Sequence, residues 1–158
     1  MKLHRLHYVQ SLPVDLETCW RFFSDPANLS EITPPWLNFQ VTSELPERMQ
    51  AGMMITYRIR PVLGLPIEWV TEITHADEPR FFVDEQRFGP YRFWHHQHFF
   101  RAAEQGVEME DIVHYALPLG WVAEPIHRTL VAPKLQQIFS YRREILARRF
   151  GVCDLPGD

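Results

Sequence analysis

The chain has 158 residues, enough for one domain of ordinary size with its own hydrophobic core. Hydrophobic residues make up 46% and charged residues 23%, a composition typical of a folded globular protein and not of a disordered one. The formal net charge is −4, which argues against the basic surface of a nucleic-acid-binding domain. No apolar run approaches the roughly 20 residues of a membrane-spanning helix. We therefore expect neither a nucleic acid as partner nor a membrane span.

The N-terminus and the cysteines bear on the cellular compartment. The first residues, MKLHRLHYVQ, lack the continuous apolar segment of a secretion signal. The two cysteines, Cys19 and Cys153, lie far apart and lack the close spacing of a metal-binding motif. We expect both to be reduced thiols in a cytoplasmic protein.

The first quarter of the chain predicts one strand and two short helices. Residues 3–12 alternate partly between two faces, which predicts a strand. The following stretch, PVDLETCWRFFSDP, begins with Pro13 and acidic residues and continues with apolar residues at helical spacing, which predicts a helix. Pro26 ends that helix and can begin a second one, PANLSEI.

The middle of the chain changes to a period of two. Six segments in succession predict strands, and the breaks between them contain glycine, proline and acidic residues. Strands joined by such short turns imply an antiparallel meander. The six predicted strands are residues 39–45, 53–62, 65–76, 80–87, 91–102 and 107–117.

After residue 120 the period returns to that of a helix. An apolar stripe from Ile126 to Phe150 predicts one long amphipathic C-terminal helix. Pro133 lies inside this stripe, and because an interior proline costs about 3 kcal/mol we expect a kink or a boundary there. The whole order predicts an α+β fold, with a curved antiparallel sheet of six to seven strands wrapped around the long helix. Sheet and helix then enclose either a packed core or a ligand cavity.

Four stretches add to this pattern: FFSDPANLSEITPPW (22–36), FVDEQRFGPYRFWHHQH (82–98), DIVHYALPLG (111–120) and LQQIFSYRREILARRF (135–150). In these stretches and in the order of its elements, the chain resembles the START-like, birch-pollen-allergen-like superfamily (SRPBCC proteins). Within that superfamily it is similar to the polyketide cyclase/dehydrase-like, ligand-binding branch. The resemblance implies a single helix-grip domain over residues 1–151, a short tail over 152–158 and no cofactor. It says less about function, because this scaffold hosts binders, lipid carriers and enzymes.

The most unusual segment of the sequence is GPYRFWHHQHFF, residues 89–100, with three histidines among aromatic residues. Alternate residues of a strand share a face, so Trp94, His96 and His98 lie on one side. The resemblance groups these three side chains and makes Asp111 and Tyr115 of the next strand their neighbours. Which face points inward stays open, because both faces are aromatic.

The histidines admit four interpretations. Two histidines on one face supply two ligands of a metal site, and Asp111 or His114 could add a third; we expect no metal. His96 or His98, oriented by Asp111 or Glu72, could act as a general acid or base. They could also brace the sheet through hydrogen bonds, or place polar groups in a cavity wall.

Aromatic residues elsewhere extend the candidate cavity wall: Trp36 after two prolines, Trp69 in a predicted strand and Phe139 on the inward side of the helix. The expected function is non-covalent binding of a small hydrophobic or amphipathic molecule, such as a lipid, an isoprenoid or a polyketide-like compound. One alternative is a cyclase or dehydratase with candidate catalytic residues His96, His98 and Asp111; another is an accessory protein-interaction domain. The candidate ligand-binding residues are Trp36, Trp69, Trp94, His96, His98, Asp111, Tyr115 and Phe139.

Overall fold

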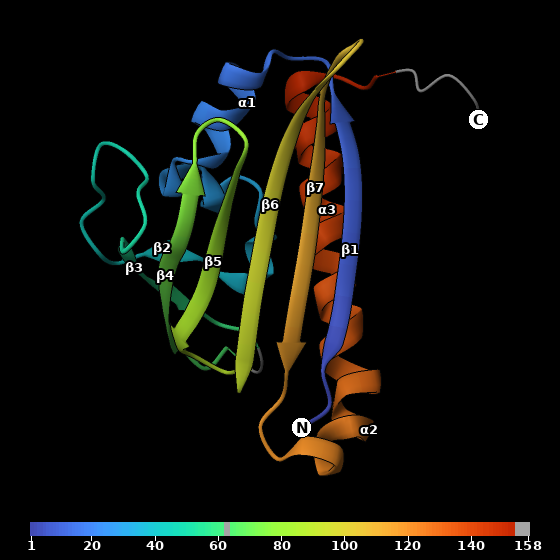
Figure 1. Ribbon diagram of the computed structural model, residues 1–158. Helices are drawn as coiled ribbons and strands as arrows, with labels where there is room; N and C mark the ends of the chain where they lie inside the picture. Colours follow the sequence, from blue (N-terminus) through green and yellow to red (C-terminus); the bar gives the residue numbers. More distant parts are fainter. Residues whose placement is uncertain (62–63, 154–158) are drawn as a thin grey trace.

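A seven-stranded antiparallel sheet curves around a long C-terminal helix (Figure 1). The computed structural model describes residues 1–61 and 64–153. The strands are β1 (His4–Leu12), β2 (Gln40–Val41), β3 (Met54–Ile59), β4 (Ile67–Asp77), β5 (Phe81–Phe88), β6 (Phe93–Ala103) and β7 (Gly106–Ala116). Their order in the sheet is β1-β7-β6-β5-β4-β3-β2, so the first strand pairs with the last and the others pair in sequence. The predicted meander and the helix-grip architecture are confirmed.

The strand boundaries differ from the prediction mainly at one edge. The predicted strand over residues 39–45 is reduced to the two residues of β2. Position 62, at the end of another predicted strand, and positions 154–158 of the predicted tail lie outside the described residues. The pairing of β4 with β5 shifts register twice, between Val70 and Thr71 and between Ile73 and His75. Such bulges bend a strand and increase its twist, which helps the sheet to curve.

The helices follow the predicted order. Helix α1 (Leu16–Phe23) is capped by Asp15, whose Oδ1 accepts a hydrogen bond of 2.8 Å from the backbone N–H of Thr18. Short 3₁₀ turns follow, η1 (Pro26–Ser30) and η2 (Pro35–Leu37). None of the described helices is long and apolar enough to cross a membrane.

The C-terminal helical segment is divided into consecutive pieces. They are η3 (Gly120–Ala123), α2 (Glu124–Ile126), the π-helical turn η4 (His127–Val131) and α3 (Ala132–Phe150). Pro133 lies in the first turn of α3, directly after the π-helical turn η4, and the backbone is helical on both sides of that junction. Because proline has no backbone N–H, it cannot donate to a carbonyl of the preceding turn, and the irregular π-turn η4 lies where that bond is lost.

Two hydrophobic clusters join the helices to the sheet. The larger one contains Trp20 of α1, whose ring contacts Phe82 and Phe100 edge-on. The second places Phe139 of α3 among buried residues of β6 and β7, as predicted for this side chain. Because α3 packs on one face of the sheet only, we call that face the inner face and the opposite one the outer face.

Candidate functional site

A cavity of about 450 Å³ lies between the inner face of the sheet and α3. Ligand pockets in proteins typically measure about 300–1,000 Å³, so this volume suits one small molecule. Its wall is mostly aliphatic and aromatic, with a few polar side chains on β4, β5, β6 and α3. Six of the predicted ligand-binding residues line it: Trp36, Trp69, Trp94, His96, His98 and Phe139.

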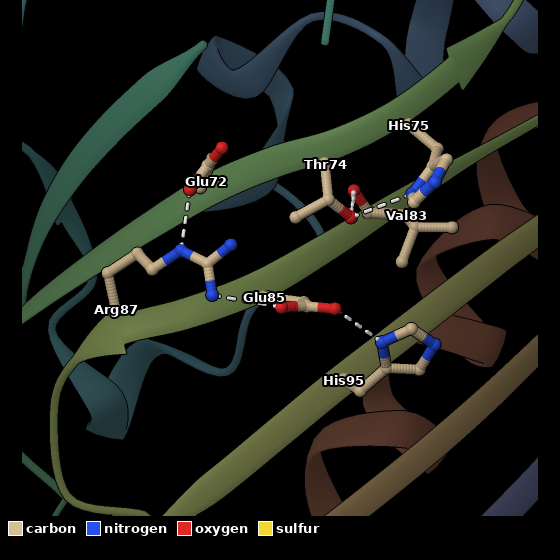
Figure 2. A network of polar contacts seen from close by, with 7 residues as sticks. All are labelled: Glu72, Thr74, His75, Val83, Glu85, Arg87 and His95. Carbon is tan, nitrogen blue, oxygen red and sulfur yellow. Dashed lines mark hydrogen bonds and ion pairs between the residues drawn. The ribbon is translucent and has the colours of Figure 1, made fainter. Parts of the chain in front are cut away.

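The structure decides which face of β6 points inward. Trp94, His96 and His98 are buried on the inner face, whereas His95 lies on the outer face. Figure 2 shows the outer face, where Nδ1 of His95 is 2.8 Å from a carboxylate oxygen of Glu85. The predicted grouping of Trp94, His96 and His98 is therefore correct.

Five charged or titratable side chains meet at the inner face and form what we call the polar cluster: Asp84, His96, His98, Asp111 and Arg142. They come from β5, β6, β7 and α3, four elements that the sheet order and the packing of the helix bring together. Nε2 of His96 lies 3.0 Å from Oδ1 of Asp111, and Nε2 of His98 lies 2.8 Å from Oδ2 of Asp84. Each histidine thus pairs with a carboxylate on a neighbouring strand.

Secondary contacts tie these two pairs together. Nδ1 of His96 is 3.4 Å from Oδ2 of Asp84, and Nη2 of Arg142 is 3.6 Å from Oδ1 of Asp111. Nδ1 of His98 is 2.9 Å from the same Asp111 oxygen, but its orientation does not make a hydrogen bond. Nε of Arg142 is buried without a hydrogen-bond partner among the described residues, and its guanidinium lies over the ring of Phe23.

Both carboxyl groups of the cluster stay ionised. Burial alone would raise the pKa of Asp111, but the Arg142 guanidinium and the two histidines outweigh it and hold the pKa well below its usual range. The pKa of Asp84 is likewise lowered, because His96, His98 and Arg142 together outweigh its burial. The cluster therefore places two negative charges next to an otherwise apolar cavity.

The two histidines respond in opposite directions to nearly the same surroundings. Burial and the neighbouring His98 lower the pKa of His96, and the two carboxylates only partly compensate. Burial also acts to lower the pKa of His98, but Asp111 and Asp84 outweigh it and raise the pKa above the ordinary value of 6.5. At neutral pH this favours a neutral His96 beside a more basic His98.

Two predicted ligand-binding residues do not line the cavity. Asp111 faces His98 across the β6–β7 pair, as predicted, but it lies behind the histidines. Tyr115 pairs with Trp94, also as predicted, but its hydroxyl lies 2.8 Å from Nε2 of His127, away from the cavity wall. The cross-strand neighbours of Asp111 and Tyr115 were predicted correctly. Neither side chain lines the cavity, because strand pairing alone does not decide which side chains reach it.

Two other suggested partners of the histidines lie on the opposite side of the sheet. Glu72 bonds to Arg87 on the outer face, beside Glu85 and His95 (Figure 2). His114 pairs in register with His95, so it shares the outer face. Burial and the nearby charge of Arg5 lower the pKa of His114. The suggestions that Glu72 orients the histidines, or that His114 is a third ligand, are therefore wrong.

Two residues of the polar cluster, Asp84 and Arg142, were not among the candidate residues predicted from the sequence. In FVDEQR, Asp84 shares its face with Phe82, and an acidic residue at an inward strand position was the available signal. Arg142 lies in the apolar stripe of the helix, three residues after Phe139. A charged side chain on this buried face needs a partner, and that requirement was the available signal. Each signal becomes clear only once the two inward faces are known to meet.

Two groups of side chains in the described part of the chain have the composition of a metal site. They are Asp84, His96 and His98 in the polar cluster, and His4, Glu124 and His127 near the start of β1, with donor atoms within 4.8 Å of one another. In the second group the rings of His4 and His127 are stacked 3.6 Å apart and tilted by only 15°. Because nitrogen lone pairs lie in the ring plane, nearly parallel stacked rings do not aim at one ion.

Comparison with known proteins supports the fold. No family model matches the chain, and no curated protein matches it. Among solved structures, a protein from Chromobacterium violaceum is similar with a TM-score of 0.68 and 15% identity, over 97% of this chain and 100% of that one. Ginseng major latex-like protein 151 from Panax ginseng is similar with a TM-score of 0.67 and 12% identity, over 94% of this chain and 97% of that one. Ara h 8.0201 gives a TM-score of 0.62 and 14% identity, over 93% and 99%. At these identities the likeness establishes the fold alone.

Proposed function

We propose that this protein binds a small, largely apolar molecule non-covalently in the cavity between the sheet and α3. The observation that carries the proposal is the cavity itself, about 450 Å³ of space with a mainly apolar wall and a few convergent polar groups. A protein that used its inner face only for stability would be expected to fill such a volume, because interiors pack as densely as organic crystals.

The wall also has features of an entrance. Leu119 and Ile126 line the cavity and are at the same time exposed to solvent. Trp36 also lines the cavity and is exposed to solvent. Nζ of Lys134 lies 4.3 Å from the centre of the Trp36 ring. Exposed apolar residues around an opening are typical of sites that receive apolar ligands.

The volume and the wall restrict the class of ligand. A mostly aromatic and aliphatic surface favours a ring-containing or single-chain molecule, such as an isoprenoid or a polyketide-like compound, over a two-chain membrane lipid. This fits the polyketide cyclase-like branch that the sequence resembles. A cytoplasmic location, with Cys19 and Cys153 as free thiols, belongs to the same proposal. An interaction domain without a ligand fits less well, because it would leave the cavity unexplained.

Native mass spectrometry of gently purified protein, with organic extraction of the same sample, tests the proposal. We expect an added organic mass in a one-to-one ratio, or uptake of the fluorescent apolar probe N-phenyl-1-naphthylamine by the empty protein. The inward variant Thr71→Phe should reduce this uptake, since Thr71 lines the cavity, whereas Thr74→Phe on the outer face should not. If the protein shows no bound organic mass and takes up no probe, the proposal of ligand binding is refuted.

A second function, acid–base catalysis of the cyclase or dehydratase type, is favoured by one observation. His96 and His98 both line the cavity, and their pKa values are shifted in opposite directions. Paired groups of this kind can serve as base and acid in one site. Incubation of the extracted ligand with wild-type protein and with His98→Gln would distinguish the two functions. Conversion by the wild type alone, at ligand concentrations that saturate both proteins, indicates an enzyme; no conversion by either supports a binding protein.

A further inference from the structure

One polar group of the cavity wall differs from the others in its access to the cavity. The side chain of Asp84 is 17% exposed, against 8% for His96, 5% for His98 and 9% for Arg142. All four line the cavity. Within the polar cluster, the carboxylate of Asp84 is therefore the charged group most accessible from the cavity, whereas Lys134 lines the opening beside Trp36.

The two oxygens of this carboxylate are not equivalent. Oδ2 is 2.8 Å from Nε2 of His98 and 3.4 Å from Nδ1 of His96. Oδ1 forms no hydrogen bond with any residue in the described parts of the chain. An ionised carboxylate can only accept hydrogen bonds, and an acceptor that faces an apolar cavity without a donor is costly.

The charges around Asp84 limit which ligand group can form a hydrogen bond with its Oδ1. The cluster holds two carboxylates and the Arg142 guanidinium, and proton uptake by the more basic His98 brings the positive and negative charges closer to balance. A ligand carboxylate would approach Oδ1 as a like charge in a low-dielectric site, which is strongly unfavourable. A hydroxyl or an N–H group would instead donate a hydrogen bond to the free oxygen without adding a negative charge.

We propose that Oδ1 of Asp84 is the polar anchor of the ligand, and that the ligand carries a hydrogen-bond donor, a hydroxyl or an amine, on an apolar body. This inference rests on the proposed binding function and narrows its ligand class. His98 and His96 act as positioning residues, because they contact Oδ2 of a residue that lines the cavity and so leave Oδ1 available to a ligand. An apolar molecule with a carboxylate or with acceptors alone belongs to the class that the site rejects.

Four compounds on one biphenyl scaffold test the donor requirement by displacement of N-phenyl-1-naphthylamine. They are 4-phenylphenol and 4-phenylbenzylamine, which donate, and 4-methoxybiphenyl and biphenyl-4-carboxylate, which do not. A hydrogen bond to a charged group is worth about 1.5–3 kcal/mol, so we expect at least one of the two donors to bind about tenfold more tightly than the methoxy compound. The carboxylate should bind most weakly. The better donor then shows whether the ligand is a neutral hydroxyl compound or an amine.

Variants link the preference to Asp84. In Asp84→Ala the ratio between the better donor and the methoxy compound should fall close to one, and Asp84→Leu, which keeps roughly the size of the side chain but has no acceptor, serves if the alanine variant does not fold. Glu85→Gln is the matched control, because Glu85 is the next residue of β5 and lies on the outer face (Figure 2). This control should keep the wild-type ratio.

The outcomes separate this inference from the proposal on which it rests. Equal binding of donors and the methoxy compound by the wild type, or a ratio unchanged in both Asp84 variants, would overturn the anchor while leaving ligand binding intact. Failure of the probe and of all four biphenyls to bind would refute the binding function itself.

Discussion

Asp111 is the residue on which the polar cluster depends most, and the substitution Asp111→Asn tests this. The carboxylate is 2% exposed and lies 3.0 Å from Nε2 of His96, 2.9 Å from Nδ1 of His98 and 3.6 Å from Nη2 of Arg142. An asparagine keeps the shape and one acceptor oxygen but removes the negative charge. The variant then leaves the Arg142 guanidinium buried without its counter-charge.

The magnitude follows from the closest full charge. Two unit charges 3.6 Å apart at an effective dielectric constant of about 20 attract by roughly 5 kcal/mol. Part of this is offset, because the neutral amide no longer requires a carboxylate to be desolvated. Measured losses on breaking buried ion pairs are about 3–5 kcal/mol, and we expect a loss of unfolding free energy in that range. For a chain of this length, the loss corresponds to a fall in Tm of roughly 6–20 °C.

Urea denaturation followed by circular dichroism measures this loss, with Glu110→Gln as the control. Glu110 precedes Asp111 in β7 but bonds to His7 and Arg101 at the sheet surface, so its replacement should cost less than about 1 kcal/mol. The double variant Asp111→Asn/Arg142→Met should lose less than the sum of the two single variants, since it removes the uncompensated charge. A loss below about 1 kcal/mol for Asp111→Asn would refute the account of the cluster.

Three further predictions concern His98, His96 and the glycine of a turn. In a ¹H NMR titration the pKa of His98 should lie above 6.5 and that of His96 below it. The stability that His98 adds is then present below its unfolded pKa and is lost as the pH rises through its folded pKa. The variant His98→Gln should not show this loss. Conversely, the lowered pKa of His96 makes the fold lose stability as the pH falls, so in His96→Gln the urea midpoint should fall less between neutral and acid pH than in wild type, and an equal fall would contradict the shift. Gly106→Ala should cost more stability than Gly52→Ala in urea denaturation, because both glycines have positive φ but only at Gly106 would a Cβ collide with the backbone of Leu12; equal losses would contradict this.

The order of the elements could be predicted because each depends on local patterns. The period of two along residues 91–102 and the period of 3.6 along α3 were sufficient to place a strand and a helix. The partners of Trp94 and His98 on β7 followed from the resemblance and agree with the register. β2 is shorter than its sequence suggested, because strand length at a sheet edge depends on the partner strand rather than on propensity.

The inner composition of the site could not be predicted to the same extent. Both faces of β6 are aromatic, so alternation left open whether His95 or His96 points to α3. Asp84 belongs to the site only because β5 pairs with β6 in a register that sets it opposite His96. That contact joins residues 12 apart in the sequence, on opposite sides of a turn. The alternation within β5 does not show whether the carboxylate of Asp84 is buried on the inner face or exposed.

The position of the polar cluster bears on its purpose. Buried ion pairs are weak contributors to stability, and well-packed apolar residues of similar volume are often as good or better by about 1–4 kcal/mol. The sheet and α3 already supply such packing on either side of the cluster, through Phe100 and Val113 among others. Charged groups at this point therefore add little that the fold needs. They do supply fixed donors and acceptors where the cavity wall would otherwise be apolar, and orientation of a bound molecule requires them there. This difference in energetic value is the physical reason for proposing that the cluster takes part in ligand recognition.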